Sequence, residues 1–478
     1  MATVTLHVDD PEIGQISPLL HGHFAEHLGR CIYDGLWTGT QLNEPVIEAL
    51  QRINPPVVRW PGGCFADDYH WRDGIGPWSG RPRTVNIHWG QTVEDNSFGT
   101  HEFLALCRRL GAEPYLAGNV GSGTPQELRD WVEYCNFAGD SRLAQERAAN
   151  GSPAPFGVRW WGVGNENWGC GGDMAPDDYC REYKRFAVFL RDYSETSLQL
   201  VACGPNGFDL EWTRRFFAKL KDYGAPRLHA FAAHYYCGTA GTATQYTEAQ
   251  WYELLKSARR IEELVVRTRT LMDGHDPERK IKLLVDEWGT WHTPTPGQNP
   301  AWLFQQSTVR DALVAAMSLD IFHNHADKIA MANIAQFVNV LQAMVLTDGD
   351  RLLCTPTYHV FDLYQKHRGG QALRPRIDAG EAAPGVPVLS GSGSRHGDQI
   401  VLTLVNSSAS DAVPVVVALR GASGQIVAAT TLCGPDIQAH NTFEQPNQVT
   451  PKPLSAAPDR LVLPAASVTL IEMRMGAT

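Results

Sequence analysis

The sequence has no apolar run of the about 18 residues that a membrane-spanning helix requires, and no run of basic residues that could follow a phosphate backbone. Its 41 Lys and Arg against 52 Asp and Glu give a formal net charge of -11, which also disfavours nucleic acid and anionic membranes as partners. The first residues, MATVTLHVDD, lack the basic, apolar and small-residue zones of a secretion signal. We therefore expect a cytoplasmic protein that binds neither nucleic acid nor membrane.

The cysteines also lack the spacing of a paired site. The ten Cys residues include no CxxC pair and are scattered along the chain, as is typical of reduced thiols in a large cytosolic enzyme. The sequence therefore predicts no disulfide. His21, His23 and His27 are close in sequence, but without matching ligands they indicate hydrogen-bonded histidines rather than a metal site. We expect a protein without a metal or an organic cofactor.

Charged residues make up only 19% of the 478 residues and hydrophobic residues 43%, which is the composition of a globular protein. Short apolar runs alternate with amphipathic stretches through the first three quarters of the chain, the pattern of parallel strands and crossover helices. Eight such repeats predict an α/β fold, a (β/α)8 TIM barrel, over residues 18–368. The runs span residues 19–27, 56–63, 113–120, 158–166, 198–205, 228–236, 281–288 and 328–336.

Segments of helical period separate these runs. Gly111 ends the first, and Pro125 and Pro176 open the next two at a helix position where a missing N–H has no cost. We expect helices over residues 101–111, 125–136, 176–193, 249–272 and, as the last helix of the barrel, 355–367.

After Gly370 the pattern changes to alternating runs separated by Gly, Ser, Asp and Pro. It predicts a jelly-roll-like antiparallel β-sandwich over residues 369–478. Residues 1–17 contain a further strand-like segment, which we expect to pair into the sandwich and make that domain discontinuous. All fourteen Trp residues lie at or before position 302, so we expect the sandwich to be structural rather than sugar-binding.

Two acids close predicted barrel strands. Glu166 ends the fourth strand and Glu287 the seventh, and active sites of such barrels lie at the carboxyl ends of the strands. One acid of this kind is equally well explained as a hydrogen-bonded strand end or an ion pair. Two of them, flanked by Asn and Trp residues, favour a catalytic pair.

Hydrolysis of a glycosidic bond requires such a pair, because one carboxyl group protonates the leaving oxygen and the other acts from the opposite side of the anomeric carbon. A separation of about 5 Å makes the second group a nucleophile and retains the configuration. While Glu287 is ionised, its charge raises the pKa of Glu166 and helps to keep that group protonated.

Longer motifs around these acids carry a family resemblance. From about residue 15 to 345 the sequence closely resembles the α-L-arabinofuranosidases of glycoside hydrolase family 51, which are clan A glycosidases. The motifs are HFAEHLGRCIYDGLW (23–37), RWPGGCFADDYHWRDGIGP (59–77), GNENWGCGG (164–172), DEWGTW (286–291) and IAQFVNV (334–340). The resemblance implies Glu166 as general acid/base and Glu287 as nucleophile.

The resemblance also implies roles for residues around the sugar. Asn165 resembles the Asn that hydrogen-bonds the sugar 2-hydroxyl, and Glu26 resembles the acid that holds furanose hydroxyls. The other matches are His234 and Tyr236, which support the nucleophile, Gln336, which lines the subsite, and Trp89 and Trp291, which wall the pocket.

Cys64 departs from the family pattern, because many members have Asn at this position and that Asn contacts the sugar. A thiol is a weak hydrogen-bond partner. We therefore place Cys64 beside the sugar with a weakened contact, and a buried Cys that only fills space stays an alternative. Asp67 and Asp68 follow closely, and either compensate for this contact or serve as loop residues.

The sequence thus predicts a retaining, exo-acting hydrolase that removes terminal α-L-arabinofuranosyl residues from arabinose-containing oligosaccharides, a step in arabinan and arabinoxylan degradation. The resemblance further implies a homo-oligomer, of which a hexamer is one form. Another clan A activity, an endo-β-glucanase or a galactofuranosidase, stays open because the fold and two acids fix the mechanism better than the sugar. A non-catalytic sugar-binding protein is the alternative of another class, and the presence of both acids counts against it.

Overall fold

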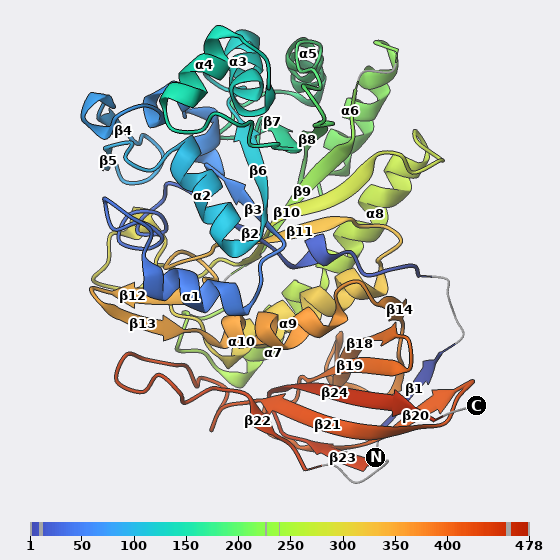
Figure 1. The fold of residues 1–478 in the computed structure, drawn as a ribbon. Helices are drawn as coiled ribbons and strands as arrows, with labels where there is room; N and C mark the ends of the chain where they lie inside the picture. Colours follow the sequence, from blue (N-terminus) through green and yellow to red (C-terminus); the bar gives the residue numbers. More distant parts are fainter. Residues whose placement is uncertain (1, 9–12, 225–226, 239, 456–459, 477–478) are drawn as a thin grey trace.

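The computed structural model describes residues 2–8, 13–224, 227–238, 240–455 and 460–476, and its larger part is a barrel of eight parallel strands surrounded by helices (Figure 1). The strands are β2 (Gly22–Phe24), β3 (Val57–Trp60), β6 (Glu113–Gly118), β7 (Trp160–Val163), β8 (Gln199–Asn206), β9 (Ala230–Cys237), β10 (Lys282–Thr290) and β11 (Met331–Ala335). They close in the order β10-β11-β2-β3-β6-β7-β8-β9. Each strand overlaps one of the eight predicted apolar runs, so the predicted (β/α)8 barrel is confirmed.

The helices bear out the start and stop signals of the sequence. They are α1 (Glu44–Arg52), α2 (Thr100–Leu110), α3 (Pro125–Asn136), α4 (Arg142–Ala149), α5 (Pro176–Ala187), α6 (Leu210–Lys221), α7 (Glu248–Arg259), α8 (Ile261–Asp273), α9 (Val309–Asn324) and α10 (Pro356–Tyr364). Gly111 ends α2 with a left-handed φ of 69°, and Pro125 and Pro176 occupy the first turns of α3 and α5. Within the described ranges, no helix combines the length and the apolar character needed to cross a membrane.

The last predicted helix, 355–367, is an α-helix to Tyr364 and a 3-10 helix over Gln365–His367, and two other predicted helices end or break early. The helix predicted over 176–193 ends at Ala187, and the one predicted over 249–272 is broken at Arg260 into α7 and α8. At both places N–H groups bond three residues back instead of four, which tightens the chain into a turn. An apolar period alone does not report such a turn.

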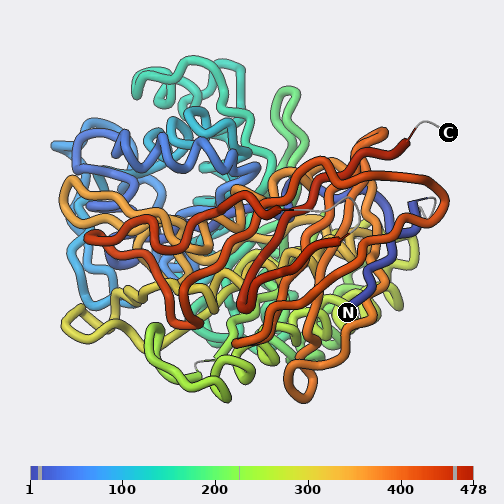
Figure 2. The backbone as a smooth tube through the Cα atoms, turned by 90° about the horizontal axis from the view of Figure 1, so that it is seen from below, coloured from blue at the N-terminus to red at the C-terminus, as the bar shows by residue number. Residues whose placement is uncertain are grey.

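The C-terminal part is a sandwich of two sheets. Its strands are β1 (Ala2–His7), β14 (Gln371–Leu373), β15 (Arg376–Asp378), β18 (Leu389–His396), β19 (Gln399–Asn406), β20 (Val413–Arg420), β21 (Gly424–Leu432), β22 (Lys452–Pro453), β23 (Arg460–Leu463) and β24 (Ser467–Met475). The sheet orders are β15-β1-β20-β23 and β14-β18-β19-β24-β21-β22. Figure 2 shows the N-terminal segment among the C-terminal strands. The predicted sandwich with an N-terminal strand is therefore confirmed, although β1 runs parallel to β20.

Helix α9 lies between the barrel and the sandwich. It is buried along almost its whole length because it packs against β10 of the barrel and against β18, β19 and β24 of the sandwich. A helix enclosed on all sides has no polar face, which accounts for its weak amphipathic pattern. The limits predicted for the two domains, 18–368 and 1–17 with 369–478, stay a prediction.

Candidate active site

Glu166 and Glu287 meet at the carboxyl end of the barrel. Glu166 lies just after β7, and Glu287 lies in the second half of β10. His234 of β9 lies between them, with its Nδ1 2.8 Å from Glu166 Oε1 and 3.5 Å from Glu287 Oε2. One oxygen of each carboxyl group and one ring nitrogen of His234 all lie within 4.8 Å of one another. Two carboxyl groups at this separation can act on the same bond.

A β-bulge in β10 brings two consecutive acids to the barrel mouth. Val285 pairs with Ala233 and Glu287 pairs with His234, so Asp286 and Glu287 together oppose one residue of β9. Neighbouring side chains of a regular strand point to opposite faces, whereas a bulge re-aims one of them. Both Asp286 and Glu287 therefore contact His234.

Arg59 of β3 connects the acids from the other side. Its Nη1 donates a hydrogen bond to Glu287 Oε1 at 2.6 Å, and its Nη2 donates to the side-chain oxygen of Asn165. Its Nε lies 3.4 Å from Asp286 Oδ2, and Asp286 Oδ1 also accepts a hydrogen bond from His234 Nε2 at 2.9 Å. All five side chains are buried.

Burial disfavours every charge in this cluster, so the charges must compensate one another. Burial by itself would raise the pKa of Asp286, but the charges of Arg59 and His234 outweigh it and lower this pKa to about 2. Burial by itself would lower the pKa of His234, but the charges of Glu287 and Asp286 outweigh it and raise this pKa to about 10. Burial raises the pKa of Glu166; the hydrogen bond from His234 opposes this shift and the charge of Glu287 adds to it. With Glu166 protonated, the cations Arg59 and His234 balance the anions Asp286 and Glu287.

A cavity opens beside the two acids. Two of the ten predicted site residues, Asn165 and His234, lie outside this cavity, in an adjoining hollow that Glu166 also lines. The eight that line the cavity are Glu26, Cys64, Trp89, Glu166, Tyr236, Glu287, Trp291 and Gln336. The structure thus brings all ten predicted residues together.

Glu26 is the third acid of the cavity. Trp89 Nε1 donates to its Oε1 at 2.9 Å, and Gln336 Nε2 donates to its Oε2 at 3.1 Å. A Cβ on Gly63 would lie 2.8 Å from Oε2, so glycine in the PGG motif leaves room for this carboxyl group. Burial and the charge of Glu287 raise the pKa of Glu26 to about 7.

Aromatic side chains form part of the cavity wall. The Tyr236 hydroxyl donates a hydrogen bond to Glu287 Oε2 at 2.8 Å. The Trp291 ring meets the Tyr236 ring edge to face at 5.1 Å and is 36% exposed. Trp89 comes from the connection between β4 (Thr84–Val85) and β5 (Val93–Glu94). Rings with an apolar face and a polar edge suit the binding of a sugar.

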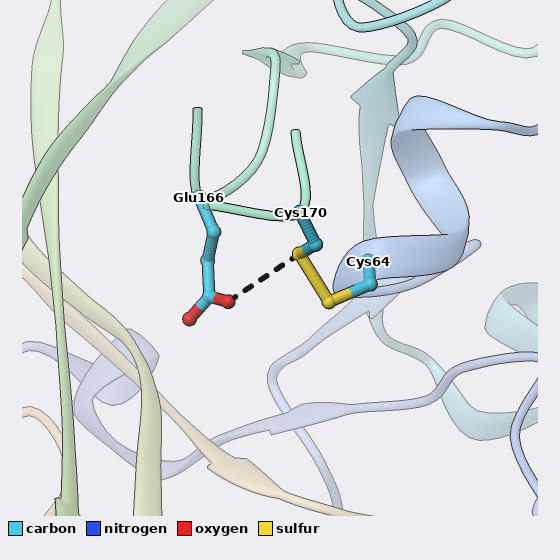
Figure 3. Close-up of side chains that lie close together, drawn as sticks. All are labelled: Cys64, Glu166 and Cys170. Atoms are coloured by element: carbon cyan, nitrogen blue, oxygen red, sulfur yellow. Dashed lines mark hydrogen bonds between the residues drawn. A yellow bond between two sulfur atoms is a disulfide. The ribbon is translucent and has the colours of Figure 1, made fainter. Parts of the chain in front are cut away.

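Cys64 and Cys170 form a disulfide, so the prediction of no disulfide is wrong (Figure 3). Cys64 begins a short 3-10 helix after β3, and Cys170 lies in the loop after β7. These strands are separated in the barrel by β6 alone, which brings Cα atoms 106 residues apart in sequence to 5.4 Å. Cys64 therefore offers the cavity a disulfide sulfur in place of the predicted thiol, and it does more than fill space. The other eight cysteines are free.

Asp67 holds two loops together and does not supply the sugar contact that Cys64 lacks. Its carboxylate accepts backbone hydrogen bonds from Val120, Gly121 and Asn165 at 2.6–2.8 Å. Burial raises the pKa of Asp67 to about 7, against these three hydrogen bonds. Its contacts hold the loops after β6 and β7 in place, and neither Asp67 nor Asp68 lines the cavity.

The three N-terminal histidines point to different partners. His21 Nε2 lies 2.9 Å from His323 Nε2, and His27 Nδ1 lies 3.2 Å from Glu94 Oε2. His23 stacks on Phe337 with ring centroids 4.6 Å apart.

Three residues that contact the predicted site residues were not predicted from the sequence, namely Arg59, Asp286 and Cys170. Arg59 is the one charged residue of the predicted strand 56–63, and this is a signal that could have identified it. In a regular strand only one of the neighbours Asp286 and Glu287 would face the site, and the sequence does not show the bulge that brings both there. No spacing rule joins Cys170 to Cys64.

Known proteins match the chain along nearly its whole length. The family model of the α-L-arabinofuranosidase 1 domain matches residues 49–253, and that of the α-L-arabinofuranosidase C-terminal domain matches residues 286–467. The chain is 40% identical to an intracellular exo-α-L-arabinofuranosidase of Bacteroides ovatus, over 99% of this chain and 96% of that protein.

Solved structures match equally far. The crystal structure of the GH51 arabinofuranosidase from Xanthomonas axonopodis pv. citri has a TM-score of 0.95 at 40% identity, with 99% of both chains covered. The arabinose complex of an α-L-arabinofuranosidase from Thermotoga maritima has a TM-score of 0.88 at 30% identity, also with 99% of both chains covered.

Proposed function

The chain belongs to the α-L-arabinofuranosidases of glycoside hydrolase family 51, and we propose that it is a retaining, exo-acting enzyme that removes terminal α-L-arabinofuranosyl residues from oligosaccharides. The observation that carries this proposal is the spacing of Glu166 and Glu287, each with an oxygen within 4.8 Å of the other. Retaining glycosidases hold their two carboxyl groups about 5 Å apart, whereas inverting enzymes need about 6.5–9.5 Å to admit a water molecule.

In the first step Glu287 attacks the anomeric carbon while Glu166 protonates the leaving oxygen. Arg59 and Tyr236 donate hydrogen bonds to Glu287 at 2.6 Å and 2.8 Å, which stabilise its ionised form and fix its direction. The raised pKa of Glu166 helps to hold its proton until the leaving oxygen takes it. The product of this step is a covalent glycosyl-enzyme.

In the second step a water molecule hydrolyses the glycosyl ester, with Glu166 as the base. Once Glu287 is esterified, its negative charge no longer raises the pKa of Glu166, while the hydrogen bond from His234 continues to lower it. Glu166 therefore changes from acid to base between the two steps without a conformational change.

The cavity supports exo action on a furanosyl end. Its wall includes Trp89 and Trp291, whose rings suit the binding of a terminal sugar unit. Glu26 and Gln336 provide polar groups for sugar hydroxyls. We place the enzyme in the cytoplasm, acting on oligosaccharides from arabinan or arabinoxylan, and as a homo-oligomer; the word intracellular in the name of the Bacteroides ovatus relative supports the first of these.

A panel of substrates tests this function with one enzyme preparation. It comprises aryl α-L-arabinofuranoside, aryl β-D-xyloside, aryl β-D-galactofuranoside and a soluble β-glucan. We expect the arabinofuranoside to have the highest kcat/KM, by a factor of about 10 or more over the others. Preferred cleavage of the galactofuranoside or the β-glucan would replace the proposed substrate, and no hydrolysis of any would leave a sugar-binding protein.

A further inference from the structure

The Cys64–Cys170 disulfide lies directly against Glu166 (Figure 3). Cys170 Sγ is 3.6 Å from Glu166 Oε2, and the two sulfurs and one carboxylate oxygen lie within 4.8 Å of one another. A disulfide sulfur carries no proton, so the cysteine is not a donor in this contact. Glu166 Oε1 is engaged by His234, which leaves Oε2 as the oxygen nearest the sulfurs.

We propose that reduction of this disulfide creates a zinc site with Cys64, Cys170 and Glu166 as ligands, and that zinc bound there blocks hydrolysis. Thiolate sulfur and carboxylate oxygen are both ligands that zinc takes, and a three-residue site leaves a fourth position for water. The blocking half of this inference rests on the proposed function, because it requires Glu166 to be the general acid.

The positions of the ligands fit this coordination after a small movement. Sulfurs that are no longer bonded separate to van der Waals contact, and tetrahedral zinc with bonds of about 2.3 Å places its sulfur ligands roughly 3.8 Å apart. The two Cα atoms are 5.4 Å apart, so rotation about the side-chain bonds of Cys64 and Cys170 is enough to separate the sulfurs. Neither loop has to move far.

The chemistry needs one reductant, and a dithiol supplies it. The dithiol gives two electrons and two protons, the bond between the cysteine sulfurs breaks, two thiols form, and the dithiol becomes a disulfide. Zinc then displaces the thiol protons and the proton of Glu166, which makes its affinity rise with pH. Glu287 and Glu26 line the same cavity, and their negative charge above the pKa of Glu26, about 7, favours a cation, while the positive charge of His234 on Glu166 Oε1 opposes it.

The site is accessible through the substrate cavity. Cys64 and Glu166 line this cavity, and Cys64, Glu166 and Cys170 are all partly exposed. A small reductant and a metal ion can therefore reach it along the path that the substrate takes. Zinc on Glu166 would remove the proton needed by the leaving group, so the reduced enzyme would lose activity in proportion to bound zinc.

The test compares oxidised and reduced wild-type enzyme after removal of the reductant. Cobalt(II) is the spectroscopic probe, because thiolate ligation gives a charge-transfer band in the near ultraviolet. We expect this band, and one zinc per chain by calorimetry, only in the reduced enzyme. We also expect zinc to lower kcat/KM for an arabino-oligosaccharide, whose poor leaving group needs the general acid, by about a hundredfold in the reduced enzyme alone, reversibly with EDTA.

Matched variants identify the ligands. C64S/C170S should show neither the cobalt band nor zinc inhibition, whereas C354S/C433S, which removes the two partly exposed free thiols, should keep both after reduction. Equal zinc inhibition of oxidised and reduced wild-type enzyme would refute the proposed zinc site, and this comparison does not depend on the folding of any variant. A thiolate band with full activity would overturn the blocking half, and the activity of the oxidised enzyme tests the proposed function separately.

Discussion

The Asp286 carboxylate accepts a hydrogen bond from His234 Nε2 at 2.9 Å. This contact fixes the imidazole so that its Nδ1 faces Glu166 Oε1 at 2.8 Å. Because Asp286 is buried and ionised, it also stabilises the positive charge of His234. Asp286 therefore controls both the orientation and the charge of the residue between the two catalytic candidates.

Asp286→Asn should lower the pKa of His234, because the substitution removes one of the negative charges that raise it. We expect a fall of at least one pH unit, which corresponds to about 1.4 kcal/mol, in an NMR titration of 15N-labelled histidine. Tyr115→Phe is the matched control, since it removes a 2.8 Å hydrogen bond to the same carboxylate without removing its charge. Equal pKa values of His234 in the wild type and Asp286→Asn would refute this role.

Glu287→Ala should abolish turnover of every substrate, because no covalent intermediate forms without the carboxylate. Azide should then restore cleavage of an activated aryl arabinofuranoside and give a glycosyl azide of inverted configuration, measured by NMR. Residual activity of about a tenth of wild type would exclude Glu287 as the nucleophile.

Glu166→Ala should reduce activity to an extent that depends on the leaving group. General acid catalysis contributes about 10²–10⁴-fold for a poor leaving group such as a sugar alcohol, and much less for an activated phenol. Steady-state kcat/KM values for a natural arabino-oligosaccharide and for a dinitrophenyl glycoside measure the difference. Equal losses for both substrates would show that Glu166 is not the general acid.

Buried histidines between the barrel and the sandwich should make the fold sensitive to acid. His323 lies 2.9 Å from His21 and next to His367, and burial together with the charge of Arg368 lowers the pKa of His323 to about 3. Such a group is neutral in the folded state and protonated in the unfolded state below pH about 6.5. Its contribution is therefore complete above this pH and is lost as pH falls, with a slope of about 1.4 kcal/mol per pH unit for each group.

His323→Gln should accordingly flatten the dependence of the free energy of unfolding on pH between 6.5 and 4, even where it lowers stability at pH 8. Urea unfolding at a series of pH values measures this slope. His7→Gln, at an exposed position of β1, is the control and should leave the slope unchanged. A wild-type slope in the His323 variant would assign the acid sensitivity to other groups.

The fold was predictable because buried parallel strands are short continuous apolar runs, and each of the eight runs contains most of one barrel strand. Glu166 and Glu287 were predictable as polar ends of such runs. That Asp286 joins Glu287 in the site was not, because Asp286 follows the inward-facing Leu284 by alternation and a bulge between Val285 and Glu287 is needed to turn both acids to the same side. The disulfide was not predictable, because the loops that carry Cys64 and Cys170 are brought together by the order of strands in the closed barrel and not by their spacing in the sequence.

The most direct test of the mechanism is the configuration of the first product formed from an aryl α-L-arabinofuranoside in water containing methanol. Methanol intercepts the glycosyl-enzyme and gives a methyl glycoside that does not mutarotate, so NMR reads its anomeric configuration. A double displacement through Glu287 predicts methyl α-L-arabinofuranoside. Formation of the β anomer, or release of arabinose with no methyl glycoside at any methanol concentration, would contradict the retaining mechanism.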